Sequence, residues 1–429
     1  MIDLLPVPQD RFACPCGAGE LTVNGFHLPG MVPFARTTCA ECGNEYLAHL
    51  HVGFCSNHDF IVEPKSGAVH STVTARWYRD FLIAATQSLD SVPAPVERRT
   101  RRATGDDVLL LNCLDPVYGH CLHRLFSLDA YRRHGFSGSV IAIVPRFLAW
   151  LVPDDVDELW IVDVALRRSN LGNQAIAAMA DGLASRVSRL RYASMAYGHD
   201  LDIARYTGVE PFAVRGHDSV SPPRLTINWR EDRCWTTGGK RMDDQAAVAD
   251  QLRLYRLLLE ALRKEAPDLD AAVTGYGRTG TFQPWVQDLR IVEHDTEAER
   301  GWATRYSESH LSIGIHGSNT ILPAALSLGA MELVVTRFWP HILVTWEWVN
   351  RMRASEALAR FRQIPVSASV SDIASVALMQ LRRMQGSAGY ALMGKLQATE
   401  TAGSIMFRHA GAFQHSEPIV VHDENGAEM

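Results

Sequence analysis

The sequence predicts an α/β protein in which two Rossmann-like domains face one another across a cleft, preceded by a small cysteine-rich module. Three observations predict this fold class. The chain has 429 residues, which gives room for two or three domains. From residue 107 onward, short apolar runs alternate with stretches of helical periodicity, as in parallel βα units. Four of the eight cysteines lie before residue 43, and this bunching favours metal binding over a disulfide framework.

The expected elements follow in chain order. We expect a module at 1–60, a helical segment and linker at 61–105, an N-terminal Rossmann-like domain at 106–220, a C-terminal one at 221–412 and a tail at 413–429. A helix is expected around 75–88 and an exposed linker at 92–102, where arginines cluster. The first domain should hold strands at 108–113, 140–144 and 159–164 and helices at 120–133 and 173–188. The second should hold strands at 225–229, 271–274, 289–292, 311–315 and 332–335 and a long helix at 244–264.

Charge and hydropathy narrow the function classes. Lys and Arg number 42 against 48 for Asp and Glu, and a net charge of −6 disfavours a nucleic-acid partner, which requires a broad cationic surface. The first residues show no secretory signal, and apolar stretches are interrupted before they reach membrane-spanning length. We therefore expect a cytoplasmic protein without a membrane span. The oligomeric state is left open, with a homodimer as one option.

Two cysteine pairs, each followed by glycine, indicate a metal site. Cys14 and Cys16 are separated by 22 residues from Cys39 and Cys42. This arrangement resembles a zinc ribbon, in which four thiolates complete a closed tetrahedral site with a structural role and no open position for catalysis. The first pair is one residue shorter than the usual knuckle, so a nearby side chain could replace one ligand. The candidates are His49, His51, Cys55 and His58. The alternative is four reduced cysteines without a metal.

A histidine-glycine turn in the second domain indicates an anion site. The predicted strand 311–315 ends at His316 and Gly317, and Ser318 and Asn319 open a helix. Backbone N–H groups and the helix dipole at such a turn favour a bound anion. Glu332 begins the next strand and is a candidate for binding the ribose hydroxyls. The alternative is a βαβ packing unit in which Ser318 caps the helix and His316 merely ends a strand.

Arginines follow the first strand of the same domain. The strand 225–229 leads into Arg230 and Arg233, and Lys240 follows two glycines. Guanidinium groups at a strand end suit a diphosphate, because each can donate two hydrogen bonds to its oxygens. The alternative is that Glu231 and Asp232 pair with these arginines at the surface.

A histidine-bearing helix start follows the first strand of the first domain. Asp115 lies in the turn, and His120 lies in the first turn of the predicted helix, where it suits a general base. Asp115 is the reserve candidate for that role. We expect His123, one turn further, to belong to a solvated face.

In this order, the three segments resemble the GT-B glycosyltransferases, and most closely glycosyltransferase family 61. The resemblance covers about residues 105–340, and the turn from His316 to Asn319 is its most specific part. Tyr118 before the Gly-His pair and the cysteine module depart from the family pattern. The resemblance implies a nucleotide-sugar donor on the C-terminal domain, a hydroxyl acceptor on the N-terminal domain and transfer without a catalytic metal.

The expected function is therefore glycosyl transfer, with a single displacement that inverts the anomeric centre. Arg230, Arg233 and the amides after His316 would stabilise the departing diphosphate. Two other functions remain open. One is a zinc-ribbon binding protein that recognises a nucleic acid or protein partner through the ribbon and the arginines at 98–102, with the α/β body as a nucleotide-binding scaffold. The other is a nucleotide-binding enzyme with a different chemistry.

Overall fold

The computed structural model describes residues 12–50, 60–71, 76–87, 94–168, 172–193, 201–212, 222–235, 245–335, 338–339 and 360–385. The chain forms two compact units, the first running to Gly198 and the second beginning at His199. The predicted boundary near residue 220 lies further along the chain, and each unit is described by itself.

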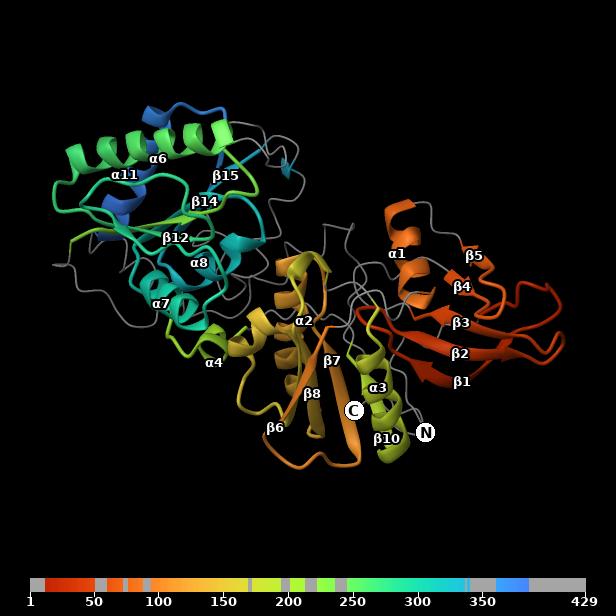
Figure 1. Cartoon of the computed structure of the whole chain (residues 1–429). Helices are drawn as coiled ribbons and strands as arrows, with labels where there is room; N and C mark the ends of the chain where they lie inside the picture. The colour runs from red at the N-terminus through yellow and green to blue at the C-terminus, as the bar shows by residue number, and fades with distance from the viewer. Residues whose placement is uncertain are drawn as a thin grey trace, which may run out of the picture. The chain divides into compact units, whose positions relative to one another are not determined.

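The first unit opens with an antiparallel sheet, the N-terminal meander (residues 21–71), coloured red to orange in Figure 1. Its strands are β1 (Leu21–His27), β2 (Phe34–Cys39), β3 (Glu45–His49), β4 (Phe60–Val62) and β5 (Val69–Ser71), paired in that order. Helix α1 (Arg76–Gln87) follows, close to the predicted helix at 75–88. The sheet continues past residue 60, because buried Phe60 and Val62 extend it with a further hairpin.

A second sheet of the first unit has the predicted parallel α/β pattern. Its strands are β6 (Val96–Thr100), β7 (Asp107–Asn112), β8 (Ser139–Pro145), β9 (Glu158–Val162) and β10 (Arg189–Tyr192), in the order β10-β7-β8-β9-β6. The helical segments between them are α2 (Tyr118–Arg133), η1 (Arg146–Leu151), η2 (Leu166–Arg168) and α3 (Gln174–Arg186). The side chain of Asn173 caps α3 by accepting a hydrogen bond from the amide of Ile176.

The expected exposed linker at 92–102 is in part a strand. β6 pairs antiparallel with β9 at the edge of the sheet, and Arg98 donates to both carboxylate oxygens of buried Glu158 over 2.7 Å. Sequence reasoning missed this strand because its polar residues lack an apolar alternation. Edge pairing requires only one apolar face, and here an ion pair fixes the strand as well.

The second unit contains a fully parallel sheet. Its strands are β11 (Arg224–Trp229), β12 (Asp270–Gly275), β13 (Gln287–Asp288), β14 (Leu311–Ile315), β15 (Ala330–Val334) and β16 (Phe361–Pro365). The order β13-β12-β11-β14-β15-β16 corresponds to 3-2-1-4-5-6 in chain order, the strand order of a Rossmann fold. Successive strands are added on one side of β11 as far as β13 and then on its other side from β14 onward. This reversal is the topological switch point, where doubly wound sheets bind ligands.

Helices cover both faces of this sheet. The helical segments of this unit are α4 (Ile203–Thr207), α6 (Gln245–Glu265), α7 (Thr296–Ser307), η3 (Ser318–Thr320), α8 (Ile321–Leu326) and α11 (Val370–Gln385). Figure 1 shows α6 and α11 on one side of the strands and α7 and α8 on the other. The strand predicted at 289–292 is displaced: β13 is shorter and earlier, and Val292 is 69% exposed.

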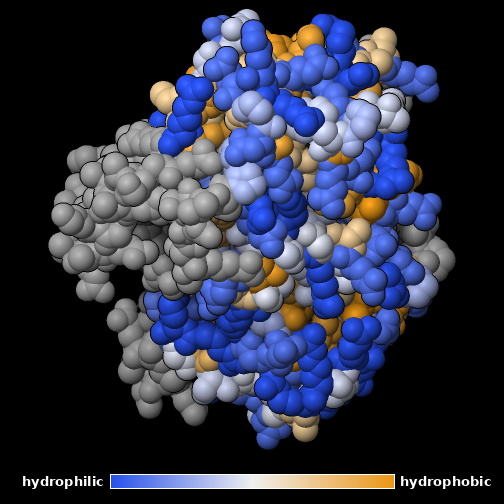
Figure 2. Space-filling model, turned by 90° about the vertical axis from the view of Figure 1, so that its left-hand side faces the viewer, coloured by the Kyte–Doolittle hydropathy of each residue, from blue (hydrophilic) through white to orange (hydrophobic). Residues whose placement is uncertain are grey.

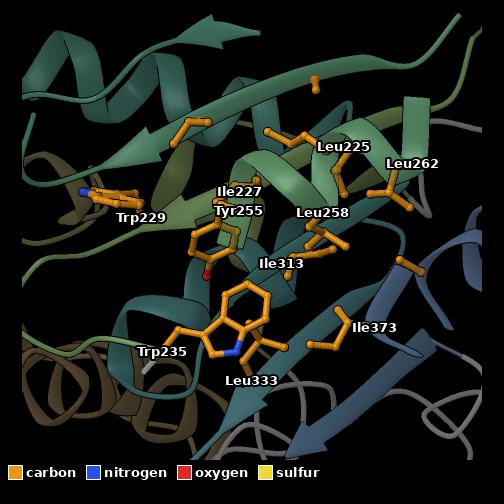
Figure 3. Packing of buried hydrophobic residues seen from close by; sticks show 14 of the residues in the cluster. Leu225, Ile227, Trp229, Trp235, Tyr255, Leu258, Leu262, Ile313, Leu333 and Ile373 are labelled. Atoms are coloured by element: carbon orange, nitrogen blue, oxygen red, sulfur yellow. The ribbon is translucent and has the colours of Figure 1, made fainter. Parts of the chain in front are cut away.

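The core of the second unit forms where α6 and α11 meet the sheet. The apolar spacing of α6 places Tyr255, Leu258 and Leu262 on one buried face. Figure 3 shows these side chains packed against Ile227 of β11 and Ile313 of β14. Because each fully buried leucine contributes about 2 kcal/mol, this face holds the switch-point strands firmly in register.

No described helix combines the length and apolarity needed to cross a bilayer. On the face shown in Figure 2, hydrophilic residues predominate among the described ones, with hydrophobic residues scattered between them.

Candidate functional site

The switch point of the second sheet brings together residues from two neighbouring strand ends. Arg230 and Arg233 follow β11, and His316, Gly317 and Asn319 follow β14, which pairs directly with β11. We call these five residues the switch-point site. The turn after β11 is fixed from α6, because buried Gln251 donates to the carbonyl of Arg230 over 2.8 Å and accepts from the amide of Trp235 over 2.9 Å.

Both guanidinium groups lie over the turn after β14. Nη1 of Arg230 donates to Oδ1 of Asn319 over 2.7 Å, and Arg233 donates to the carbonyl of His316. A Cβ atom at Gly317 would lie 2.5 Å from Nη1 of Arg230 and 3.0 Å from Nη1 of Arg233. Gly317 has a φ of +153°, a conformation that favours glycine, and an added Cβ would displace the Arg230 guanidinium.

The surface pairing considered from the sequence is present for one acidic residue. Nε and Nη2 of Arg230 each donate over 2.6 Å to Asp232, which is half exposed. Glu231 has a different role: it accepts from the amide of Thr279 over 2.8 Å and from Nε1 of Trp229 over 3.2 Å. Asp232 therefore moderates the charge of the switch-point site, while Glu231 ties the end of β11 to the segment after β12.

Asn319 supplies a donor that the described residues do not satisfy. Its backbone carbonyl oxygen accepts from Nδ2 of Asn228 over 2.6 Å. Its Nδ2 is buried, and among the described residues no hydrogen-bond acceptor reaches it. An unsatisfied buried N–H group is costly, so this donor together with two guanidinium groups suits a ligand rich in acceptor oxygens.

Glu332 lies deeper than a ribose ligand requires. It is 1% exposed; its Oε2 lies 2.9 Å from Nδ1 of His316, and its Oε1 accepts from the hydroxyl of Thr320. The buried carboxylate of Glu332, on β15, thus contacts His316 and Thr320. Sequence reasoning placed this residue at the correct strand but could not establish which way its side chain faces.

Other predicted residues of this site fall in several places. Ser318 begins η3 and provides no side-chain cap, whereas the hydroxyl of Thr320 bonds to the carbonyl of Gly317 over 2.7 Å. Lys240 lies outside the described residues. Sequence reasoning missed Phe338, whose ring lies 4.1 Å from the guanidinium carbon of Arg233. Its position just beyond the next strand along, β15, is the signal that could have found it.

The histidine-bearing segment of the first unit forms a carboxylate–imidazole dyad. Oδ1 of Asp115 lies 3.1 Å from Nδ1 of His120 and accepts from the amide of Val117 over 2.9 Å. Asp115 is buried, while the His120 side chain is 33% exposed. Nη2 of Arg124 lies 3.6 Å from the second carboxylate oxygen of Asp115. We call Asp115 and His120 the dyad; its geometry fixes the ring through one nitrogen and leaves the imidazole accessible.

The expectation that His123 belongs to a solvated face of α2 is wrong. His123 is 4% exposed and Arg124 8%, because α2 is buried along almost its whole length. Burial lowers the pKa of His123 well below its usual value. Burial also raises the pKa of Cys113 to about 12. His123 and Cys113 are thus held in their neutral forms and do not suit proton transfer or nucleophilic attack at neutral pH.

The cysteine cluster, Cys14, Cys16, Cys39 and Cys42, fits a tetrahedral metal. All four sulfur atoms lie within 4.8 Å of one another, with 3.7 Å between Cys14 and Cys42 and 3.9 Å between Cys16 and Cys39. Zinc with bonds of about 2.3 Å to four thiolates separates them by about 3.8 Å. A backbone hydrogen bond from Asn44 lowers the pKa of Cys42 to about 7, which favours the thiolate that a metal needs.

The residues considered as replacements for a cysteine ligand either lie apart from this cluster or lie outside the described residues. His49 is buried 6.1 Å from the ring of Phe34 and is not a member of the cluster. His51, Cys55 and His58 lie outside the described residues. Among described side chains, the hydroxyl of Tyr46 lies 3.7 Å from the sulfur of Cys14 and 3.8 Å from that of Cys42.

Comparisons with known proteins give the following. No family model matches the chain, and no curated protein matches it. Among solved structures, it is similar to the spinosyn forosaminyltransferase SpnP, with 11% identity, a TM-score of 0.37 and coverage of 69% of this chain and 96% of that one. It is also similar to the spinosyn rhamnosyltransferase SpnG complexed with thymidine diphosphate, with 13% identity, a TM-score of 0.26 and coverage of 68% of each chain.

A third similar structure is a protein from Listeria monocytogenes described as a UDP-N-acetylglucosamine 2-epimerase, with 8% identity, a TM-score of 0.30 and coverage of 68% of this chain and 69% of that one. All three TM-scores lie below 0.5. The residues of the site therefore carry the functional conclusion.

Proposed function

We propose that the protein is a glycosyltransferase that moves a sugar from a nucleotide-sugar donor to an acceptor hydroxyl. The observation that carries the proposal is the convergence of the Arg230 and Arg233 guanidinium groups on Gly317, next to Asn319 with its unsatisfied Nδ2 donor. It lies at the switch point of a Rossmann-type sheet, where doubly wound folds bind nucleotides. A diphosphate matches this set of donors in charge and in the number of acceptor oxygens.

The switch-point site is proposed to hold the leaving group. As the bond between the anomeric carbon and the diphosphate oxygen breaks, negative charge builds on that oxygen. Arg230 and Arg233 would stabilise this charge from fixed positions. Asn319 would donate from Nδ2 to the same diphosphate. His316, held by Glu332, would keep the turn in shape. Lys240 and Ser318 remain further candidate donors.

The dyad is proposed to remove the acceptor proton. His120 would take the proton from the acceptor hydroxyl. At the same time the acceptor oxygen would bond to the anomeric carbon, in a single displacement that inverts this carbon. Asp115 would hold the imidazole by Nδ1 and stabilise the imidazolium that forms, as carboxylates do in other histidine-dependent sites. This contact supports a role of Asp115 as the positioning residue of His120, in place of the reserve-base role expected from the sequence.

We infer that the cysteine cluster holds a structural zinc ion. Zinc in a closed site of four thiolates supplies folding free energy and no reaction step. Elemental analysis of protein purified without added metal should find about one zinc per chain, and Cys39→Ala should lose it.

Calorimetric titration with nucleoside diphosphates and the matching nucleosides tests the donor assignment. Arg230→Ala and Arg233→Ala should each weaken diphosphate binding about tenfold or more and leave nucleoside binding nearly unchanged, since charge-assisted hydrogen bonds are worth about 1.5–3 kcal/mol. Arg253→Ala is the matched control, because Arg253 is exposed on α6 and pairs only locally with Asp250. Equal losses for diphosphate and nucleoside would contradict the assignment.

A panel of nucleotide-sugars with simple hydroxyl acceptors tests the chemistry. Release of nucleoside diphosphate that depends on the acceptor supports glycosyl transfer. Diphosphate binding with conversion of the nucleotide-sugar in the absence of any acceptor would indicate the alternative, a nucleotide-binding enzyme with a different reaction.

A further inference from the structure

The parallel sheet of the first unit has a switch point of its own. In chain order β7, β8, β9 and β10 are its four parallel strands, and they lie in the order β10-β7-β8-β9. The reversal therefore falls between β7 and β10. In an open doubly wound sheet, the crevice at this position receives the ligand.

Here a loop of the N-terminal meander occupies that position. Asn112, the last residue of β7, donates from Nδ2 to the carbonyl of Gly30 over 2.7 Å and to the hydroxyl of Tyr192, on β10, over 2.9 Å. The hydroxyl of Tyr192 in turn lies 3.5 Å from the carbonyl of Met31. We call residues 28–33, between β1 and β2, the β1–β2 loop.

Further contacts anchor the loop on both sides. The amide of Asn173, at the start of α3, donates to the carbonyl of Pro29 over 2.6 Å. Leu28 is fully buried, and the ring of Phe26 lies 5.8 Å from that of Tyr192. Leu28 and Phe26 share one hydrophobic cluster with Leu114. The β1–β2 loop is therefore packed as an integral part of the first unit.

Asn112 connects this loop to the dyad. While its Nδ2 faces Gly30, its Oδ1 accepts from the amide of Leu114 over 3.1 Å, at the start of the segment that carries Asp115. Arg124 bridges the same two places, with Nη1 3.4 Å from the carbonyl of Asn112 and Nη2 3.6 Å from Asp115. Movement of the Asn112 amide would thus shift the residues that hold the dyad.

We propose that the N-terminal meander closes the switch point of the first sheet and that Asn112 is the positioning residue through which it holds the dyad. The cysteine cluster fixes the opposite end of the β1–β2 hairpin, so a metal bound there would order the β1–β2 loop and, through Asn112, residues 113–121. The catalytic meaning of this coupling rests on the proposed function; the coupling itself does not.

Hydrogen exchange of the full chain measures the coupling directly. Asn112→Asp keeps an acceptor for Leu114 but removes the donor to Gly30. It should speed amide exchange in residues 113–121 by about tenfold or more, with the zinc content and the exchange of β8 unchanged. Asn24→Asp, an exposed change on β1 whose partner is Thr38, is the matched control and should leave these amides as in the wild type. Removal of zinc by a chelator should speed exchange in β1, β2 and residues 113–121 together.

A milder variant keeps the test decisive if Asn112→Asp does not fold. Tyr192→Phe removes only the hydroxyl, which contacts Asn112, Met31 and Arg124, and should produce the same local increase in exchange. The inference is overturned if Tyr192→Phe and chelation leave residues 113–121 as protected as in the wild type while β1 and β2 exchange faster. Diphosphate binding belongs to the second unit, so its loss or retention is scored separately and reports on the proposed function alone.

Discussion

Nδ1 of His316, just after the end of β14, lies 2.9 Å from Oε2 of Glu332, in the middle of the neighbouring parallel strand β15, and both side chains are buried. The second oxygen of Glu332 accepts from Thr320, whose hydroxyl also bonds to the carbonyl of Gly317. One buried carboxylate thus fixes the imidazole and the following turn together. The shape of the switch-point site depends on a residue that does not reach its surface.

This relationship predicts the effect of Glu332→Gln on ribose recognition. Because Glu332 contacts His316 and Thr320, the variant should weaken binding of a nucleoside diphosphate and of its 2′-deoxy counterpart alike, by about three- to tenfold. Calorimetry with the two ligands measures the ratio. Glu308→Gln, at the end of α7 and paired with Arg224, is the control. A loss confined to the ribose form would restore the ribose-binding role expected from the sequence.

Gly317→Ala should weaken diphosphate binding without unfolding the chain. The added Cβ would meet Nη1 of Arg230 at 2.5 Å, and a φ of +153° is unfavourable for alanine. We expect the dissociation constant to rise by about tenfold or more, as strain of about 1–3 kcal/mol must be relieved. Gly301→Ala, in α7 with open space around its Cβ, should bind normally and unfold at a slightly higher temperature. Normal binding by Gly317→Ala would place the ligand elsewhere.

The dyad predicts a split between turnover and donor affinity. His120→Ala should lower kcat by about 10²–10⁴-fold and leave the dissociation constant of the donor nearly unchanged. Asp115→Asn should also lower kcat, because the imidazolium loses its carboxylate partner. His134→Ala, at the exposed end of α2, is the control and should keep the wild-type kcat. Full activity of His120→Ala at saturating acceptor would assign the base to another residue.

Buried His123 predicts a loss of stability in mild acid. Its folded pKa lies below the value of about 6.5 that it has in the unfolded chain, so the unfolded state binds the proton more readily. Its neutral form is fully stabilising above about pH 6.5, and the free energy of unfolding should fall below that pH by up to about 1.4 kcal/mol per unit. Urea unfolding of the wild type and of His123→Gln between pH 5 and 7 isolates this part of the slope.

The control for this measurement is His70→Gln, at an exposed position of β5. It should keep the wild-type slope. A slope that is identical in wild type and His123→Gln would mean that the imidazole is hydrated or protonated in the folded protein.

Sequence reasoning identified the fold class because the strands of parallel sheets are continuous apolar runs. The strand predicted at 311–315 agrees with β14 at both ends, and the helix predicted at 244–264 agrees with α6 to within one residue. The helix is buried on a helical period and the strand along its whole length, so burial and sequence pattern agree in both elements. The two parallel α/β sheets are thereby confirmed.

The features that could not be predicted depend on which way a side chain points and on contacts with residues far away in the sequence. The inward orientation of Glu332 follows from strand pairing, which a local pattern does not define. The burial of His123 follows from the packing of α2 on several sides, against its polar neighbours. Likewise, Asn112 looked like an ordinary strand end, since its partner Gly30 lies 82 residues earlier in the chain.

The strand that replaced the expected linker has a consequence for self-association. β6 carries Arg98 and Arg99 at one edge of the first parallel sheet, and β10 carries Arg189 and Arg191 at the other. Arg191 is already buried, but a foreign strand adding to either edge would have to desolvate the more exposed guanidinium groups of Arg99 or Arg189, and charged edge strands are a common protection against aggregation. These charges therefore disfavour growth of the sheet by strand addition at either edge.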